Sequence, residues 1–211
     1  HLLVDGRKMS KSLGNFYTLR DIIGKGYDPM AFRYLAMSSH YRSQLNFTFD
    51  ALENAKNTIN NFNNFLRHIS WLQKDVKAKP NHRLHVAIRK AREDFTKFMD
   101  DDLNTPQALA TVFGLMTVLN TAIDKNKADK RALQAVHKFM LQVNEIFDII
   151  ELKEDALLTE EEKELVEKRE HLRKEKKFQE ADVVRSLLKE RGVILEDTPQ
   201  GVRWKKEVQK R

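Results

Sequence analysis

Apolar residues in the middle of the chain recur at alternating steps of three and four. Four such series are present, within residues 52–69, 84–98, 109–123 and 133–150. This spacing places each series along one face of a helix, and a single apolar stripe has to be buried against another element. Four amphipathic helices joined by short polar links therefore predict an antiparallel helical bundle.

The links between these helices carry turn and capping residues. We expect connections near residues 79–81 and 126–129. Within DDLNTP (residues 101–106), Thr105 is expected to cap the third helix, with Pro106 at its first position. This stretch thus has a structural explanation, and we assign it no chemistry.

The two ends of the chain have other patterns. HLLVDGR at the start predicts a strand and a turn, followed by short helices beginning near Leu19 and Pro29. Near the other end, Thr159 and Glu162 have the spacing of a capping box, and a helix is expected over residues 179–190. Gly192 is placed to end that helix, and residues 193–204 predict a small hairpin around TPQG.

These elements predict a mainly α fold in three parts. Residues 1–49 form a loop and a connecting segment, residues 50–157 the helical bundle, and residues 158–211 a small α+β domain of helices and a hairpin.

Charge and composition restrict the partners. The chain has no cysteine, which excludes disulfides and thiolate metal sites within it and fits a reducing compartment. No apolar run reaches the roughly 20 residues of a membrane span. The net charge is +7, and residues 171–211 carry 12 Lys and Arg against 7 Asp and Glu. Such a basic end suits a polyanion such as nucleic acid, although on charge alone a solvated helix face and a frayed tail are the commoner explanation.

The most distinctive short stretch is KMSKSLGN, residues 8–15. Lys8 and Lys11 place two ammonium groups on a turn of small residues, where they could neutralise a triphosphate during phosphoryl or adenylyl transfer. The main-chain N–H groups of Ser10 and Ser12 could add hydrogen bonds. A lone K-x-x-K-S string is a weak signal, because exposed basic turns are common.

The complete string, however, resembles the KMSKS signature of class I aminoacyl-tRNA synthetases at every position. Three further stretches are HYRSQLNF (40–47), DDLNTPQALA (101–110) and GVILEDTPQGVRW (192–204). Together they resemble the bacterial cysteinyl-tRNA synthetase family, in the expected order and over essentially the whole chain.

The resemblance implies a reaction and roles for the first part of the chain. The family activates cysteine with ATP to cysteinyl-adenylate and transfers the cysteinyl group to tRNA(Cys). Lys11 would contact the ATP phosphates, with Lys8, Ser10 and Ser12 supporting it. The connecting segment would meet the inner side of the tRNA, with Arg42 as a phosphate contact and His40 as a structural hydrogen-bonding group.

The resemblance also assigns anticodon recognition to the C-terminal part. Arg173 would donate to bases or phosphate, Phe178 would stack on an unpaired base, and Asp182 and Asp197 would accept from base amino groups. Trp204 would stack on a base or pin the hairpin. Without the resemblance, a helix-surface charge and a turn cap are the simpler interpretations of the two aspartates.

Other implied features concern the rest of the enzyme. ATP with Mg²⁺ would be substrate, and Zn²⁺ would be held by cysteines upstream of this chain, together with the nucleotide-binding core and the HIGH-like motif. We therefore expect these 211 residues alone to be inactive in adenylate formation. The expected partners are tRNA(Cys), ATP and cysteine, without a membrane, and the expected protein is a cytoplasmic monomer.

Three alternatives remain open at this point. The chain could be a tRNA-binding module without catalysis, a related ligase that joins cysteine to an amino sugar, or a helical interaction protein. The basic C-terminal part argues against the second, and the KMSKS string is left unexplained by the third.

Overall fold

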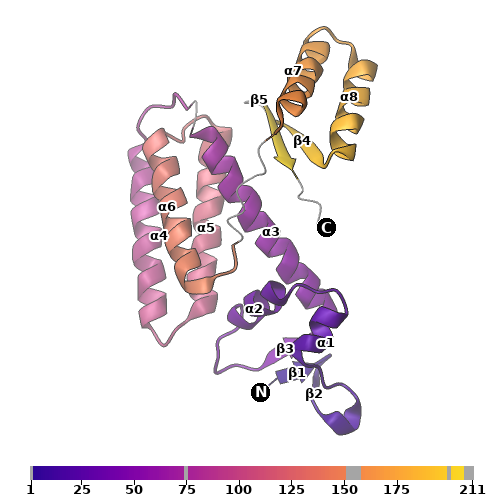
Figure 1. Ribbon diagram of the computed structural model, residues 1–211. Coiled ribbons are helices and arrows are strands. Elements are labelled where there is room, and N and C mark those ends of the chain that lie inside the picture. Colours follow the sequence, from indigo (N-terminus) through magenta and orange to yellow (C-terminus); the bar gives the residue numbers. More distant parts are fainter. Residues whose placement is uncertain (1, 74–75, 151–157, 199–200, 207–211) are drawn as a thin grey trace. The chain divides into compact units, whose positions relative to one another are not determined.

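The computed structural model describes residues 2–73, 76–150, 158–198 and 201–206. The chain divides into two units, residues 1–151 and 152–211, and each is described by itself. Helices dominate the described residues and two small sheets accompany them, which confirms the predicted mainly α class (Figure 1).

A three-stranded sheet begins the first unit. β1 (Leu2–Val4) pairs antiparallel with β2 (Arg7–Lys8) and parallel with β3 (Leu45–Phe47). Asp5 and Gly6 make the predicted turn between β1 and β2, both with positive φ, a conformation that glycine adopts without steric cost. The beginning of the KMSKS loop and the segment that leads into the bundle therefore belong to one sheet, with β1 between them.

Two short helices, α1 (Leu19–Gly24) and α2 (Pro29–Met37), connect β2 to β3. The helix α2 is anchored to the bundle at two points. Arg33 Nε donates to the carbonyl of Phe147 at 2.6 Å, and Thr105 Oγ1 donates to the carbonyl of Met37 at 2.7 Å. The connecting segment is therefore part of the same unit as the bundle.

The bundle consists of the four predicted helices. Their bounds are α3, Phe49–Leu72; α4, His82–Asp100; α5, Thr105–Asp124; and α6, Lys130–Phe147. The predicted stripes supply its core, in which Leu119, Leu133 and Met140 are fully buried. Aromatic rings add edge contacts, such as Phe95 against Phe139 at 5.6 Å between centroids.

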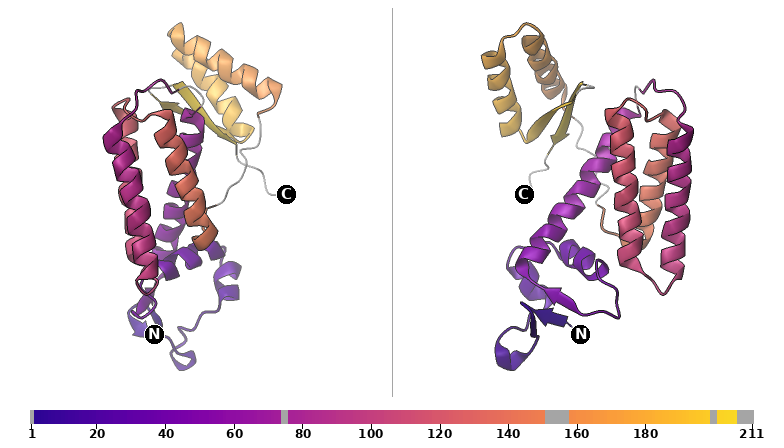
Figure 2. Two further views of the ribbon diagram at one scale, coloured as in Figure 1. Left: turned by 90° about the vertical axis from the view of Figure 1, so that its left-hand side faces the viewer. Right: turned by 180° about the vertical axis from the view of Figure 1, so that it is seen from behind.

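The helix α3 contributes to two cores. Leu52 and Ala55 in its first turns pack with Val4 and Phe47 of the small sheet. From Ile59 onward, the same stripe packs into the bundle core. Figures 1 and 2 show α3 running from the sheet into the bundle as one continuous helix.

The beginning of α5 differs from the prediction by one residue. The N-cap is Asn104, whose side chain accepts from the Gln107 N–H, while Thr105 is the first helical residue and Pro106 the second. Asparagine is as good a cap as threonine, and the Thr105 hydroxyl is used by Met37 instead.

The helix α5 also corrects the expectation about apolar runs. By length and composition alone it is long and apolar enough to cross a membrane. Its buried side chains, among them Ala108, Val112 and Leu119, instead lie in the bundle core, as those of a central bundle helix do.

The second unit is a helical hairpin with a two-stranded sheet. Its elements are α7, Glu160–Lys174; α8, Phe178–Glu190; β4, Val193–Thr198; and β5, Gly201–Lys206. The predicted capping box between Thr159 and Glu162 is present, and Gly192 follows α8 with a φ of 77°. The predicted hairpin is confirmed, although residues 199–200 of its turn lie outside the described residues.

Candidate functional site

The KMSKS loop is held by hydrogen bonds within itself. Asn15 Oδ1 accepts from the Ser10 N–H at 2.8 Å, and Asn15 Nδ2 donates to the Lys8 carbonyl at 3.1 Å. Residues 11–13 form one turn of 3₁₀ helix, η1, closed by Gly14 with a φ of 66°. The Ser10 and Ser12 hydroxyls lie 2.8 Å apart. The Asn15 side chain therefore joins the two ends of the loop.

Both lysines of this loop are exposed. Neither ammonium group has an ion-pair partner among the described residues, and Lys11 Nζ lies 5.5 Å from the centroid of the Phe16 ring. Two exposed cations on one short loop leave their charge available to an anion. The Ser10 N–H already donates to Asn15 Oδ1. It can donate to a phosphate only after this hydrogen bond breaks.

Arg42 belongs to a cluster that joins residues 40–42 to the turn between α4 and α5. Arg42 Nε lies 3.0 Å from Asp102 Oδ2, and the Tyr41 hydroxyl donates to Asp102 Oδ1 at 2.5 Å. The guanidinium also lies over the Tyr41 ring, which stacks on His40. The hydrogen bond from Tyr41, with the charge of Arg42, lowers the pKa of Asp102.

The turn that carries Asp102 has an unusual backbone. Asp102 and Leu103 are consecutive non-glycine residues with φ values of 54° and 51°. Leucine is rare in this left-handed region because its Cβ crowds the following carbonyl oxygen. The turn thus carries local strain at the point where it holds Tyr41 and Arg42. The DDLNTP stretch therefore has contacts that capping did not predict.

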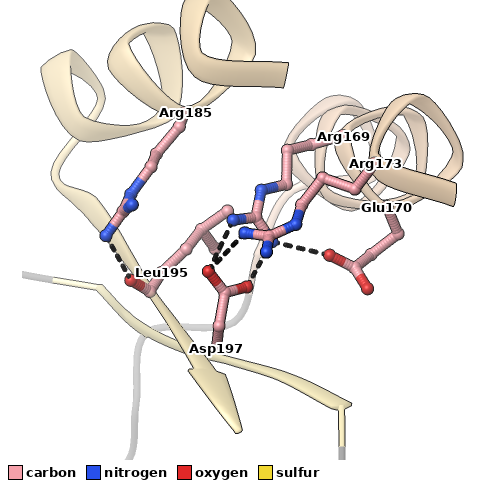
Figure 3. Close-up of polar contacts among 6 residues, drawn as sticks. All are labelled: Arg169, Glu170, Arg173, Arg185, Leu195 and Asp197. Atoms are coloured by element: carbon pink, nitrogen blue, oxygen red, sulfur yellow. Dashed lines mark hydrogen bonds and ion pairs between the residues drawn. The ribbon is translucent and has the colours of Figure 1, made fainter. Parts of the chain in front are cut away.

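In the second unit, a buried arginine gathers the charges (Figure 3). The side chain of Arg169 in α7 is 1% exposed, and its two terminal nitrogens donate to the two oxygens of Asp197 in β4 at 2.5 and 2.8 Å. Glu170 lies 2.7 Å from Arg169, and Arg173 donates to Asp197 at 2.6 Å. Such bidentate pairs fix geometry as well as charge, so this network fastens the hairpin to α7.

The network limits what Asp197 can do. A carboxylate offers about four acceptor positions. In Asp197, hydrogen bonds from Arg169 and Arg173 already occupy three of them. These hydrogen bonds, first the one from Arg169, lower the pKa of Asp197. Asp197 does not cap a turn, it keeps about one acceptor position, and Arg173 is paired with it.

The three other predicted residues of this unit lie in different surroundings. Phe178, the first residue of α8, is 57% exposed, and Asp182 is exposed one turn later. Trp204 in β5 is half-buried against the core of the unit. The exposed ring fits stacking on a base, whereas the packing of Trp204 supports the hairpin.

The described residues offer no site for the zinc ion that the sequence resemblance implies. No group of three His, Cys, Asp or Glu side chains gathers among them. The residues present therefore do not fit this metal.

Several residues of these sites were not predicted. Asn15 gave no signal beyond its place in the string, and Tyr41 and Asp102 lie 61 positions apart. Arg169 sits in a helix so polar that no periodicity marks it as buried. Its spacing of four from Arg173 was the available hint, because residues four apart share a helix face.

Two stretches of the chain match models of known protein families. Residues 1–57 match the family model described as tRNA synthetases class I (C) catalytic domain, and residues 94–151 match the DALR domain. Cysteine–tRNA ligase of Leptospira interrogans is 40% identical over 209 residues, which is 98% of this chain. That of Brachyspira hyodysenteriae is 37% identical over 211 residues, and that of Thermococcus gammatolerans 40% over 215.

The chain belongs to the cysteine–tRNA ligase family. It spans 44% of the length of the Leptospira and Brachyspira relatives and 45% of the Thermococcus relative. The match to the class I (C) catalytic domain covers the small sheet, the KMSKS loop, α1, α2 and the first turns of α3.

Proposed function

We propose that this chain supplies the KMSKS loop and the tRNA-binding parts of a cysteine–tRNA ligase. The observation that carries the proposal is the loop itself. KMSKSLGN lies in the segment that matches a class I catalytic domain, and its two lysines have no ion-pair partner among the described residues. The relatives named as cysteine–tRNA ligases are similar over nearly all of this chain, which supports cysteine as the amino acid that is activated.

The two lysines act on the phosphates of ATP. When the cysteine carboxylate attacks the α-phosphate, negative charge accumulates on the departing pyrophosphate, and positioned ammonium groups stabilise it. Lys11 makes the direct contact and Lys8 supports it. When the hydrogen bond between the Ser10 N–H and Asn15 breaks, the main-chain N–H groups of Ser10 and Ser12 also donate to the phosphates. ATP enters with Mg²⁺ as substrate.

The remaining proposed residues bind tRNA(Cys). Arg42, held by Asp102, contacts a phosphate of the stem. In the second unit, Phe178 stacks on an anticodon base and Asp182 accepts from a base amino group. Asp197 has about one acceptor position left for a base, and it orients Arg173 toward the RNA. Trp204 supports the hairpin that carries them.

In this proposal the chain has three parts, residues 1–49, 50–157 and 158–211. The helix α3 begins at Phe49 and therefore crosses the first boundary. The enzyme is a cytoplasmic monomer whose other substrate is cysteine. Zinc, if the intact enzyme carries it, binds outside the described residues of this chain.

A chimera tests the reaction. Residues 1–211 would replace the matching part of the Leptospira interrogans enzyme, with which they share 40% identity. We expect the chimera to exchange pyrophosphate with cysteine and ATP and to charge tRNA(Cys), and residues 1–211 alone to do neither. Lys11→Ala should slow pyrophosphate exchange on the order of 100-fold, as loss of a single electrostatic stabiliser does.

Two outcomes of that experiment would count against the proposal. If Lys11→Ala weakened only tRNA binding, the phosphate role would be wrong. If a chimera with native stability charged no tRNA(Cys), while the Leptospira enzyme did so in parallel, the assigned activity would be wrong.

A further inference from the structure

The end of the bundle away from the KMSKS loop carries a groove with positive charge. It lies between the loop before α4 and the loop between α5 and α6, and it has a volume of about 520 Å³. Figure 1 shows these loops at the upper end of the bundle, opposite the turn between α4 and α5. We call it the bundle-end groove and define it by residues 79–83 and 126–127.

The charge of this groove comes from Lys79, Arg83 and Lys127, with His82 beside them. These side chains are exposed, and none of the three cations has an ion-pair partner among the described residues. Lys125 and Lys130 follow on either side. Positive charge that is not neutralised within the protein is available to an anion.

In the described part of the two loops, neither acidic side chain forms an ion pair with these cations. Asp124 is exposed at the end of α5, and Asp129 is 4% exposed. The Asp129 carboxylate accepts from the N–H groups of Asn81 and Ala132 and lies 3.0 Å from His85 Nε2. The Asp129 carboxylate is therefore occupied by contacts within the protein, and these contacts join the two loops.

The same network makes the groove rigid. Asn81 Nδ2 donates to the Lys127 carbonyl at 3.1 Å, and Asn81 caps α4. The groove is thus bounded by a helix beginning, whose first N–H groups and dipole also favour anions. The hydrogen bonds fix the backbone of the two loops, so the three cationic side chains start from positions held close together.

A second groove on the bundle provides a contrast. It is larger, about 940 Å³, and it is lined by Arg92 and Lys97 but also by Glu93, Asp100 and Asp101. Its acidic side chains would repel a polyanion. Charge, rather than hollow shape, therefore singles out the bundle-end groove.

We infer that the bundle-end groove binds the phosphate backbone of the tRNA, as a contact separate from Arg42 and from the second unit. This inference rests on the proposed function, which brings tRNA to the chain. The helix α4 has 19 residues, or a length of about 28 Å at 1.5 Å per residue. Arg42 and the groove lie near its opposite ends, so the bundle would contact one RNA arm at two separated phosphate clusters.

The test is tRNA(Cys) binding by residues 1–211 across a range of salt concentrations. In the groove variant, Lys79→Gln, Arg83→Gln and Lys127→Gln are combined. The control variant combines Lys90→Gln, Lys97→Gln and Lys138→Gln, which remove the same charge elsewhere on the bundle. Thermal unfolding by circular dichroism verifies that both remain folded.

We expect the groove variant to bind at least tenfold more weakly at about 0.1 M salt. The slope of log K against log salt should fall by about 2–3, one for each lost phosphate contact. The control variant should shift the affinity less than threefold, and Lys79→Arg with Lys127→Arg should bind like the unaltered chain.

The outcomes are separable. If the groove and control variants bound equally, the groove inference would be wrong while the proposed function stood. If the unaltered chain bound no tRNA(Cys), both would fail.

Discussion

Arg169 buries a charge inside a unit of only two helices and a hairpin. Its guanidinium is compensated by Asp197 and Glu170, so that it acts as the polar centre of a small core. Removal of one partner from a buried pair is costly, because the remaining charge stays desolvated. The stability of this unit should therefore depend on Asp197 more than its partial exposure suggests.

The first prediction concerns Asp197→Asn. We expect it to lower the free energy of unfolding of the second unit by about 2–3 kcal/mol, a value reduced because Asp197 is 39% exposed. Urea denaturation followed by Trp204 fluorescence, in a Trp71→Phe background, measures this change. Asp182→Asn is the matched control and should change it by less than about 0.5 kcal/mol. Equal effects of the two would contradict the structural role of Asp197.

The second prediction follows from the lowered pKa of Asp197, caused first by the hydrogen bond from Arg169. A carboxyl whose pKa is lower in the folded state stabilises the fold above its unfolded pKa of about 3.9. This contribution is lost as the pH falls through the lower, folded value. Acid titration of Trp204 fluorescence should therefore show a smaller loss of stability below pH 4 in Asp197→Asn than in the unaltered chain. Parallel acid curves would show that the pair contributes nothing.

The turn between α4 and α5 positions side chains of the connecting segment. Asp102 and Leu103 adopt left-handed backbone conformations, and the Asp102 carboxylate holds Tyr41 and Arg42 from the connecting segment. The pair is exposed, so its value for stability is small. Its effect is on the position of the Arg42 guanidinium.

The third prediction separates charge from position. Asp102→Ala makes the chain more positive, so charge alone predicts tighter binding of tRNA(Cys). If Asp102 positions Arg42, binding should instead weaken about threefold to tenfold, and Arg42→Ala should add little to it in the double variant. Filter binding of tRNA(Cys) at fixed salt measures both. Tighter binding by Asp102→Ala would exclude the positioning role.

Local pattern predicted most of these elements, for reasons that differ between them. The stripes of α3 to α6, the Thr159 capping box and Gly192 depend on neighbours within a few positions, which a sequence displays directly. The Tyr41–Asp102 and Arg169–Asp197 contacts depend on how elements pack, and no local pattern carries that information. Asn104 and not Thr105 is the cap, since asparagine caps at least as well as threonine and the Thr105 hydroxyl contacts the Met37 carbonyl instead.

At the scale of the whole molecule, the two units differ in the size of their cores. The bundle core includes buried residues from all four of its helices, whereas seven of the described residues form the buried core of the second unit. Smaller cores give smaller stability. The units should therefore respond differently to denaturant.

The fourth prediction is that the chain unfolds in two steps. Trp71 lies in α3 of the first unit and Trp204 in β5 of the second. In single-tryptophan variants, Trp204 should report a lower urea midpoint than Trp71, because the second unit has less buried apolar surface. Coincident midpoints would mean that the two units unfold as one cooperative body.

The shared helix α3 has a consequence for how this family can vary in length. An α-helix turns by about 100° per residue, so one residue inserted between Ala55 and Ile59 would swing the bundle-facing stripe away from its neighbours while the sheet-facing stripe stayed in place. Insertions and deletions should accordingly be tolerated in the loops of the first unit but not in this stretch. Relatives that differ in length here would have to add or remove whole turns.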